Sequence, residues 1–391
     1  MEFFDKKQEH SKVKLELLKR YLIPAISKMG YSKYNTKELV RIFDGFAGTG
    51  EYGDGGIGSP VIILNEVYRV LGNMRAKNID KNFKVKLHYC EKKEENFEKL
   101  NLALKKRMKC KEEKKKSCQY IDANKGLEVF SYNQNFRSCI EVIMEKRLQN
   151  KERQVPYFIF IDPFGYKDTP MELFVNLMNS GKTEIMFNMM YEEINRFITK
   201  EDDKLNETHK NFFGCTDSDL RKLQLEIANK TSKERFIIIT NFYKEKLREK
   251  NFYVNFLEIK KDNKIKMVIF LITKNKNGFI LFKDIKHKIQ SEIEAVENDS
   301  EQQKLFYEKN LDEKEQELIK NYILNKYDEK VEYEKLKEDV SNHEYFTENN
   351  LKKAINILCE ENKIKKVKNG KVNKRDFNGT TILMKEGNND E

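Results

Sequence analysis

The run Leu39-Val-Arg-Ile-Phe-Asp44, continued by Gly45-Phe-Ala-Gly-Thr-Gly50, is the stretch that most strongly indicates the fold. Its apolar first half predicts a buried strand, which ends in an acid and opens into a glycine-rich loop. Glycines let the backbone turn sharply and let a ligand approach it closely. Ser59-Pro60 then predicts a helix start, with Ser as the N-cap and Pro in the first turn. The stretch therefore predicts a strand, a ligand-binding turn and a helix.

Strands and helices alternate beyond this point. Further strands are predicted at 85–90, 118–121, 157–161 and 184–189, with helices at 92–108, 134–148 and 171–178. Such alternation is typical of a parallel sheet with helices on both faces. Two last strands, 253–260 and 266–273, flank Lys261-Asp-Asn-Lys264 and predict an antiparallel hairpin. The expected fold is therefore α/β, with a Rossmann-like sheet of the S-adenosylmethionine (SAM)-dependent methyltransferase kind, parallel with a closing antiparallel hairpin.

The chain changes character after the hairpin. A polar, acidic stretch without strand signals predicts a linker, and three short helical patterns followed by two strand patterns predict a C-terminal winged helix. The expected divisions are an α/β domain over 1–292 with a helical insertion or lid over 191–249, a linker over 293–314, a winged helix over 315–386 and a disordered tail over 387–391.

Acidic residues close three successive predicted strands, at Asp44, Glu91 and Asp122. Because parallel strands end at the same edge of a sheet, we expect these carboxylates to meet there, with Glu91 on a ribose and Asp122 on an adenine amino group. Strand ends also face water, so a purely structural role stays open, and the lack of a strict Gly-x-Gly-x-x-Gly weakens the dinucleotide alternative. The predicted SAM-binding residues are Asp44, Gly45, Phe46, Gly48, Gly50, Glu91 and Asp122.

Asp162-Pro163-Phe164-Gly165 follows the most apolar predicted strand, and its first three residues are the candidate catalytic residues. Amino-methylating enzymes carry Asp/Asn-Pro-Pro-aromatic at this position. There the acid or amide and the proline carbonyl accept hydrogen bonds from an exocyclic amine, and the aromatic ring stacks on the base. Phe164 and Gly165 depart from that pattern, although Tyr166 follows, so the acceptor stays open. A tight turn after a buried strand is the structural alternative.

Composition limits the partners and the compartment. The 391 residues carry a formal charge of +11, which favours a polyanion such as nucleic acid, although a lysine-rich composition without such a partner is the alternative. The six cysteines lack metal-ligand spacing, so we expect no metal site, no disulfide framework and a cytoplasmic protein with reduced thiols. No apolar run reaches the length of a membrane span, so we expect no membrane contact.

Lysines crowd the last predicted helix and the wing that follows it. A winged helix can place that helix in the major groove and its wing on the backbone, and lysine indicates phosphate contacts rather than base readout. Docking onto another protein is the alternative. The candidate nucleic-acid-binding residues are Lys352, Lys353, Lys365, Lys366, Lys368 and Lys371.

Several blocks together resemble the three-Cys-motif partner protein (TcmP) family, over about residues 8 to 290. The blocks are His10-Ser-Lys12 with Leu18-Lys-Arg-Tyr-Leu22, Phe43 to Tyr52, Gly58-Ser-Pro60, Phe160 to Tyr166, and Asn195-Arg-Phe197. The resemblance implies a methyltransferase-like fold and a partner with a three-cysteine, radical-SAM-like motif, often in phage or mobile-element settings. More distantly, the chain is similar to adenine methyltransferases of the RlmJ type, which share the leading His/Lys helix but keep Asp-Pro-Pro-Tyr.

The sequence therefore predicts a SAM-dependent, methyltransferase-like enzyme that acts on DNA or RNA. The first alternative is a non-methylating protein that binds SAM or a nucleotide and serves a radical-SAM three-Cys-motif protein. The setting expected for this alternative is phage defence or the repair or modification of nucleic acid. The second alternative is a defence effector that acts on a nucleotide or on phage nucleic acid.

Overall fold

The computed structural model describes residues 9–30, 38–53, 55–76, 82–200, 202–261, 264–297, 316–343, 346–369, 371–372 and 377–384. The chain divides into two compact units, Met1–Phe282 and Lys283–Glu391. The division falls inside helix α10 (Lys276–Glu297), whereas the sequence placed it after residue 292. Most of the expected linker and all of the expected tail lie outside the described residues.

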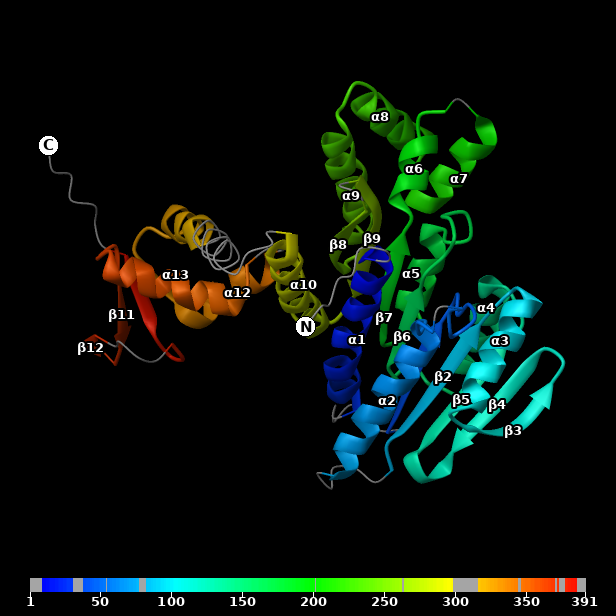
Figure 1. Ribbon diagram of the computed structural model, residues 1–391. Coiled ribbons are helices and arrows are strands. Elements are labelled where there is room, and N and C mark those ends of the chain that lie inside the picture. The colour runs from blue at the N-terminus through cyan, green and yellow to red at the C-terminus, as the bar shows by residue number, and fades with distance from the viewer. Residues whose placement is uncertain are drawn as a thin grey trace, which may run out of the picture. The chain divides into compact units, whose positions relative to one another are not determined.

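The first unit is built on a large mixed sheet (Figure 1) with the strand order β3-β4-β5-β2-β1-β6-β7-β9-β8. Its centre is parallel, and its far strands, β8 and β9, form the antiparallel hairpin that the sequence predicted. The strands are β1 (Leu39–Asp44), β2 (Lys84–Cys90), β3 (Lys109–Lys114), β4 (Ser117–Asp122), β5 (Leu127–Tyr132), β6 (Tyr157–Ile161), β7 (Thr183–Met189), β8 (Tyr253–Lys261) and β9 (Lys264–Thr273).

The third parallel strand is β5, not the run that ends in Asp122. That run is β4, which lies antiparallel between β3 and β5. Asp122 pairs with Leu127, and Leu127 pairs with Val85 near the start of β2. Asp122 therefore lies at the amino edge of the parallel strands, four residues or roughly 13 Å along the strands from the row of Asp44. The prediction that Asp122 meets Asp44 and Glu91 is wrong, because the β3–β4 hairpin reverses the chain before β5.

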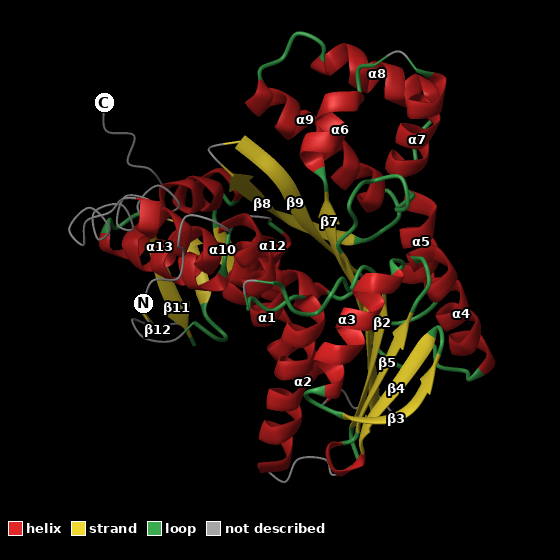
Figure 2. Cartoon of the chain, turned by 45° about the vertical axis from the view of Figure 1, so that its right-hand side comes forward, coloured by secondary structure: helices red, strands yellow, loops and turns green. Residues whose placement is uncertain are grey.

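Helices cover both faces of the sheet (Figure 2), as expected for strands buried on both sides. Neighbouring residues of β6 show the alternation. Phe158 packs on Tyr21 of α1, with ring centroids 5.8 Å apart, whereas Ile159 joins a core cluster with residues of α4 and α5. These helices are α1 (Glu9–Gly30) and α2 (Ser59–Ala76) on one face and α4 (Phe136–Gln149) and α5 (Met171–Asn179) on the other, with α3 (Glu94–Lys105) following β2.

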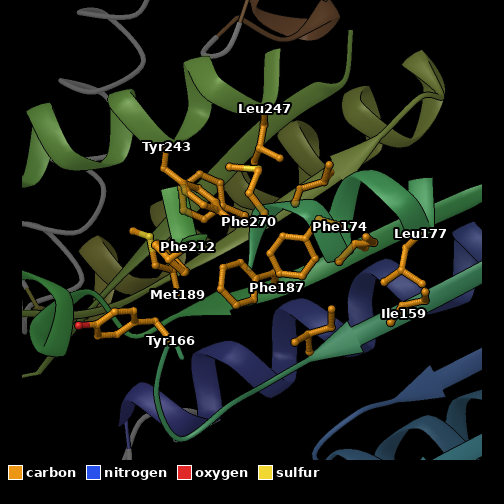
Figure 3. Packing of buried hydrophobic residues seen from close by; sticks show 14 of the residues in the cluster. Ile159, Tyr166, Phe174, Leu177, Phe187, Met189, Phe212, Tyr243, Leu247 and Phe270 are labelled. Carbon is orange, nitrogen blue, oxygen red and sulfur yellow. The ribbon is translucent and has the colours of Figure 1, made fainter. Parts of the chain in front are cut away.

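The predicted insertion after β7 is helical, with capping boxes at Thr216 and Thr231 that fix two of its helix starts. An aromatic cluster packs it onto the sheet (Figure 3). Tyr243 stacks on Phe212 at a centroid distance of 4.9 Å and meets Phe270 of β9 edge-on at 5.2 Å. The helices are α6 (Tyr191–Phe197), α7 (Asp203–Phe213), α8 (Asp217–Ile227) and α9 (Ser232–Arg248). This shared core makes the insertion an integral layer of the unit.

The described part of the second unit combines helices with a small antiparallel sheet of order β10-β13-β11-β12. The sheet has two strands beyond the two that were predicted. Lys283 is buried and donates to the carbonyl oxygens of Val340, Ser341 and His343 at the end of α12, which explains why the unit starts within α10. The elements are a helix over 316–326, β10 (Lys330–Glu332), α12 (Tyr333–Asn342), α13 (Glu348–Glu360), β11 (Ile364–Lys368), β12 (Lys371–Val372) and β13 (Thr381–Met384).

All six cysteines are free thiols. Cys90 and Cys139 are buried, and their sulfur atoms lie 2.7 Å apart where β2 meets α4. Among the described residues, no helix is both long enough and apolar enough to cross a membrane.

Candidate functional site

Three of the predicted acids converge at the carboxyl edge of the sheet. Asp44 pairs with Tyr89 of β2 and with Phe160 of β6, so its row marks the ends of all three strands. Glu91 directly follows β2, and Asp162 directly follows β6. The structure therefore brings Asp44, Glu91 and Asp162 to one place and leaves Asp122 at the other edge.

The glycine loop after β1 is tied to both neighbouring strands. The Gly45 amide donates to the Phe160 carbonyl at 2.9 Å, and the Ala47 amide donates to the Cys90 carbonyl at 2.9 Å. Gly48 and Gly50 have φ angles of +62° and +75°, which L side chains rarely adopt. The sequence therefore needs glycine at these two positions to fold the loop across the strand ends.

Glu91 holds this loop in place. The residue is 5% exposed. Its Oε2 accepts from the Gly48 amide at 2.9 Å, and its Oε1 accepts from the Lys93 amide at 2.7 Å and from the Asn96 side-chain amide at 3.5 Å. Hydrogen bonds from backbone amides to a carboxylate are charge-assisted and strong. Since each carboxylate oxygen has two lone pairs, Glu91 keeps acceptor capacity for a ligand hydroxyl.

Asp44 is the most deeply buried acid of the site. It is fully buried, accepts a hydrogen bond from the Ser59 hydroxyl at 2.7 Å, and accepts one from the Phe46 amide at 3.2 Å. Burial raises the pKa of Asp44 to about 7, against the lowering effect of these two donors. A buried carboxyl group with a raised pKa lowers the free energy of unfolding when it is ionised, and such groups are typical of functional positions.

We expect Asp44→Asn to stabilise the protein at pH 8 and to leave its stability unchanged at pH 4. The pKa of Asp44 is about 7 in the folded state and about 4 in the unfolded state. Through Asp44, the fold therefore has its full stability below about pH 4 and loses stability as the pH rises through about 7. At pH 8 the buried charge then costs about 2–4 kcal/mol, which asparagine removes. Urea unfolding at both pH values measures the effect; equal stability of both proteins at pH 8 would contradict it.

Asp162 is held from two sides. The Lys14 ammonium of α1 donates to Oδ2, and the Asn188 amide at the end of β7 donates to Oδ1 at 2.6 Å. The side chains of Lys14 and Asp162 are 12% and 20% exposed, so the ion pair is largely shielded from water. Asn188 is 1% exposed, and its Oδ1 has no hydrogen-bond partner. Asp162 is therefore fixed in orientation, and an unused acceptor lies beside it.

The residues after Asp162 have separate environments. Pro163 is buried, whereas Phe164 is 80% exposed. Tyr166 is buried, stacks on His209 of α7 and shares a hydrogen bond of 2.9 Å with it. Of these two rings, that of Phe164 is therefore the exposed one, and Tyr166 fastens the loop to the helical layer.

Sequence reasoning missed Asn133, which occupies the position that it gave to Asp122. Asn133 follows β5, and its side-chain amide donates to the carbonyl oxygens of Glu91 at 3.0 Å and Lys92 at 3.2 Å. The available signal was the run Leu127-Glu-Val-Phe-Ser-Tyr132, in which every second residue is buried and which ends directly before Asn133.

The predicted nucleic-acid-binding lysines of the second unit differ in accessibility. Lys366 is 4% exposed; its ammonium donates to Asn356 at 2.8 Å and lies 4.4 Å from the ring centroid of Phe377. Its predicted phosphate contact is wrong, because it faces the inside of the unit. Lys352 is half-buried and pairs with Glu348 at 2.9 Å. The remaining predicted lysines are exposed Lys353, Lys365 and Lys371 and half-buried Lys368.

The chain was compared with known proteins: no family model matches it, and no curated protein matches it. Within the described ranges, no group of three or more His, Cys, Asp or Glu side chains is placed to hold a metal ion. The site therefore consists of the glycine loop, three acids and the residues that hold them.

Proposed function

We propose that this protein is a SAM-dependent methyltransferase that acts on nucleic acid. The observation that carries the proposal is the meeting of the glycine loop with Asp44, Glu91 and Asp162 at one edge of the sheet. In open α/β sheets, ligands bind at the carboxyl ends of the strands, where the strand order reverses. The order β5-β2-β1-β6-β7, with an antiparallel hairpin beside β7, also supports a Rossmann-like methyltransferase arrangement.

The residues present fit such a cofactor. SAM would supply a methyl group on a positively charged sulfonium. Oε2 of Glu91 has a lone pair left for a ribose hydroxyl. Beyond its chain neighbours, no atom of the described residues lies within 4 Å of where a Cβ of Gly48 would be, so the backbone is open to close approach there. Asp162 would place negative charge beside the sulfonium, and Phe164 would contact the acceptor.

The second unit supports nucleic acid as the substrate. Its described order of helix, strand, two helices and antiparallel strands is typical of a winged helix. Lys353 on α13 and Lys365 and Lys371 on the strands that follow are exposed, as phosphate contacts require. The chain also carries a formal charge of +11, which favours binding to a polyanion.

Calorimetry with SAM, its demethylated product and NAD tests the cofactor assignment. We expect the first two to bind with dissociation constants in the micromolar range and NAD not to bind. Glu91→Gln should weaken SAM binding at least tenfold, because it removes the charge that orders the loop and accepts the ribose. Asp122→Asn is the matched control and should bind SAM like the wild type. Binding of NAD alone, or equal effects of the two substitutions, would refute the assignment.

Transfer of a labelled methyl group to mixed DNA and RNA then tests the reaction itself.

A second candidate function is a non-methylating partner of a radical-SAM three-Cys-motif protein, as the TcmP resemblance implies. Both oxygens of Asp162 already accept hydrogen bonds, one from Lys14 and one from Asn188, so fewer lone pairs are left for an amine. This observation favours the second candidate. SAM binding without methyl transfer, together with activity only in a mixture with such a partner, would select this candidate.

A further inference from the structure

The hairpin of β3 and β4 brings two lysines to the edge of the sheet that holds the candidate site. β3 is an edge strand of the large sheet (Figure 1), and none of its residues is buried. It joins β4 through the two-residue turn Lys115-Lys116. The row of strand pairs that starts at Lys114 of β3 passes through β4 and β5 and ends at Cys90 of β2, directly before Glu91. The turn therefore lies at the carboxyl edge of the sheet.

Asn133 fastens this turn to the loop after β2. Its backbone amide donates to the Lys116 carbonyl at 2.9 Å, and its side-chain amide donates to the Lys92 carbonyl at 3.2 Å. The ammonium of the next residue, Lys93, lies 6.0 Å from the ring centroid of Phe164 in the loop after β6. Lysines thus follow the carboxyl edge from the hairpin turn to the candidate site. We call them the lysine rim, which consists of Lys92, Lys93, Lys115 and Lys116.

The lysine rim keeps its positive charge. All four residues are exposed, and within the described ranges their ammonium groups form no ion pair. The two acids of β3, Glu112 and Glu113, pair instead with lysines outside the rim, at 3.0 Å and 2.7 Å. Glu94, at the start of α3, is the exposed acid that follows Lys93 in the chain. Four lysines beside one acid leave the rim with a net positive charge.

The chemistry of the hairpin fits a phosphodiester backbone better than a protein surface. Its exposed residues, Lys109 and Lys111 to Lys116, are all charged. Protein interfaces are instead built around aromatic and apolar anchors and are poor in lysine and glutamate. Charged side chains on an edge strand also hinder its pairing with a strand of another protein. Exposed lysines contact phosphates whatever the base sequence.

We propose that the lysine rim binds the phosphodiester backbone of the nucleic acid whose base reaches the candidate site. Neighbouring strands lie about 4.8 Å apart, and four to five spacings separate the hairpin from β6, so the turn is roughly 19–24 Å from the row of Asp162. At about 3.4 Å per nucleotide, this distance corresponds to about six nucleotides of one strand of a duplex. The inference rests on the proposed function for its partner and adds a docking surface in the first unit.

The test measures binding of the full-length protein to labelled single strands of about 15 nucleotides, one of DNA and one of RNA, by fluorescence anisotropy at several salt concentrations. Lys115→Gln/Lys116→Gln should weaken binding about tenfold. It should also lower the slope of log affinity against log salt by about 1.4, because each phosphate contact on a single strand contributes about 0.7. Lys84→Gln/Lys109→Gln is the matched control, because it removes the same charge from exposed lysines at the amino ends of β2 and β3. This control should bind like the wild type.

Three outcomes would overturn the inference. Equal losses in the two double variants would show that only the net charge matters, and unchanged binding in Lys115→Gln/Lys116→Gln would leave the rim without a role. A polyglutamate peptide that binds as tightly as the strands, with the same loss in Lys115→Gln/Lys116→Gln, would assign the rim to an acidic protein. A loss with only DNA or only RNA supports the inference and identifies the strand. Thermal unfolding checks that each variant is folded.

Calorimetry with SAM separates this inference from the proposed function, because the rim contains none of the predicted cofactor residues. If SAM does not bind but Lys115→Gln/Lys116→Gln loses its affinity for the strands, the rim remains and the cofactor assignment is rejected. If SAM binds and the two double variants bind the strands alike, the rim is rejected and the cofactor assignment remains.

Discussion

Asp162→Ala is expected to lower the rate of methyl transfer by about a hundredfold or more while changing SAM affinity only a few-fold. The carboxylate is fixed by the Lys14 ammonium and by the Asn188 amide, so it presents one orientation to the acceptor. Groups that position and polarise an acceptor in this way typically contribute factors of 10² to 10⁴ to a rate. The measurement is transfer of a labelled methyl group under single-turnover conditions, with calorimetry for SAM.

Asp162→Asn separates charge from shape. Alanine leaves the Lys14 ammonium without its partner in a largely buried place, which destabilises the fold as well as the site. Asparagine keeps the volume and one hydrogen-bond acceptor, so it should fold more stably than alanine yet remain slow. Asp168→Asn is the matched control, because Asp168 is an exposed acid a few residues along the same loop. Equal rates for Asp162→Asn and the wild type would contradict a role for this charge in the reaction.

The acids of the site differ in how well the sequence could place them. Asp44, Glu91 and Asp162 follow runs of buried residues that are continuous in the sequence, so their positions at strand ends are a local property. Asp122 ends a run in which only Cys118 and Tyr120 are buried, and its strand pairs antiparallel with β3 and β5. Strand direction depends on how distant segments pair, which no single run encodes.

The contacts that give the site its chemistry are also long-range. Lys14 and Asp162 are separated by 148 positions, and the pairing of their side chains follows from the packing of α1 at the sheet edge. Lys366 shows the same limit in the second unit. In the sequence it is one of several lysines in a basic run, but the alternation of β11 turns Lys365 outward and Lys366 inward. The number of lysines in the basic run therefore overestimates how many of them can contact phosphate.

Arg147→Met is expected to cause the largest loss of stability, about 4 kcal/mol in the free energy of unfolding. Arg147 of α4 is fully buried at the amino edge of the sheet. It donates to the Thr183 hydroxyl at 2.8 Å and to the carbonyl oxygens of Val155 at 3.0 Å and Lys182 at 3.1 Å. Its guanidinium also lies 3.9 Å from the ring centroid of Tyr157. Methionine fills the space but leaves these buried acceptors unpaired, at about 1–3 kcal/mol for each that finds no water.

Burial lowers the pKa of Arg147 to about 10, so the group stays charged at neutral pH and its hydrogen bonds offset the cost of burying the charge. Arg147→Lys should fall between the wild type and methionine, because one ammonium cannot match the fork of donors of a guanidinium. Arg137→Lys is the control on the same helix. Arg137 is largely exposed and pairs with Glu141 one turn away, so its replacement should change stability by less than about 0.5 kcal/mol. Urea unfolding measures all three variants. If Arg147→Met costs no more than Arg137→Lys, the network around Arg147 does not hold α4 to the strands.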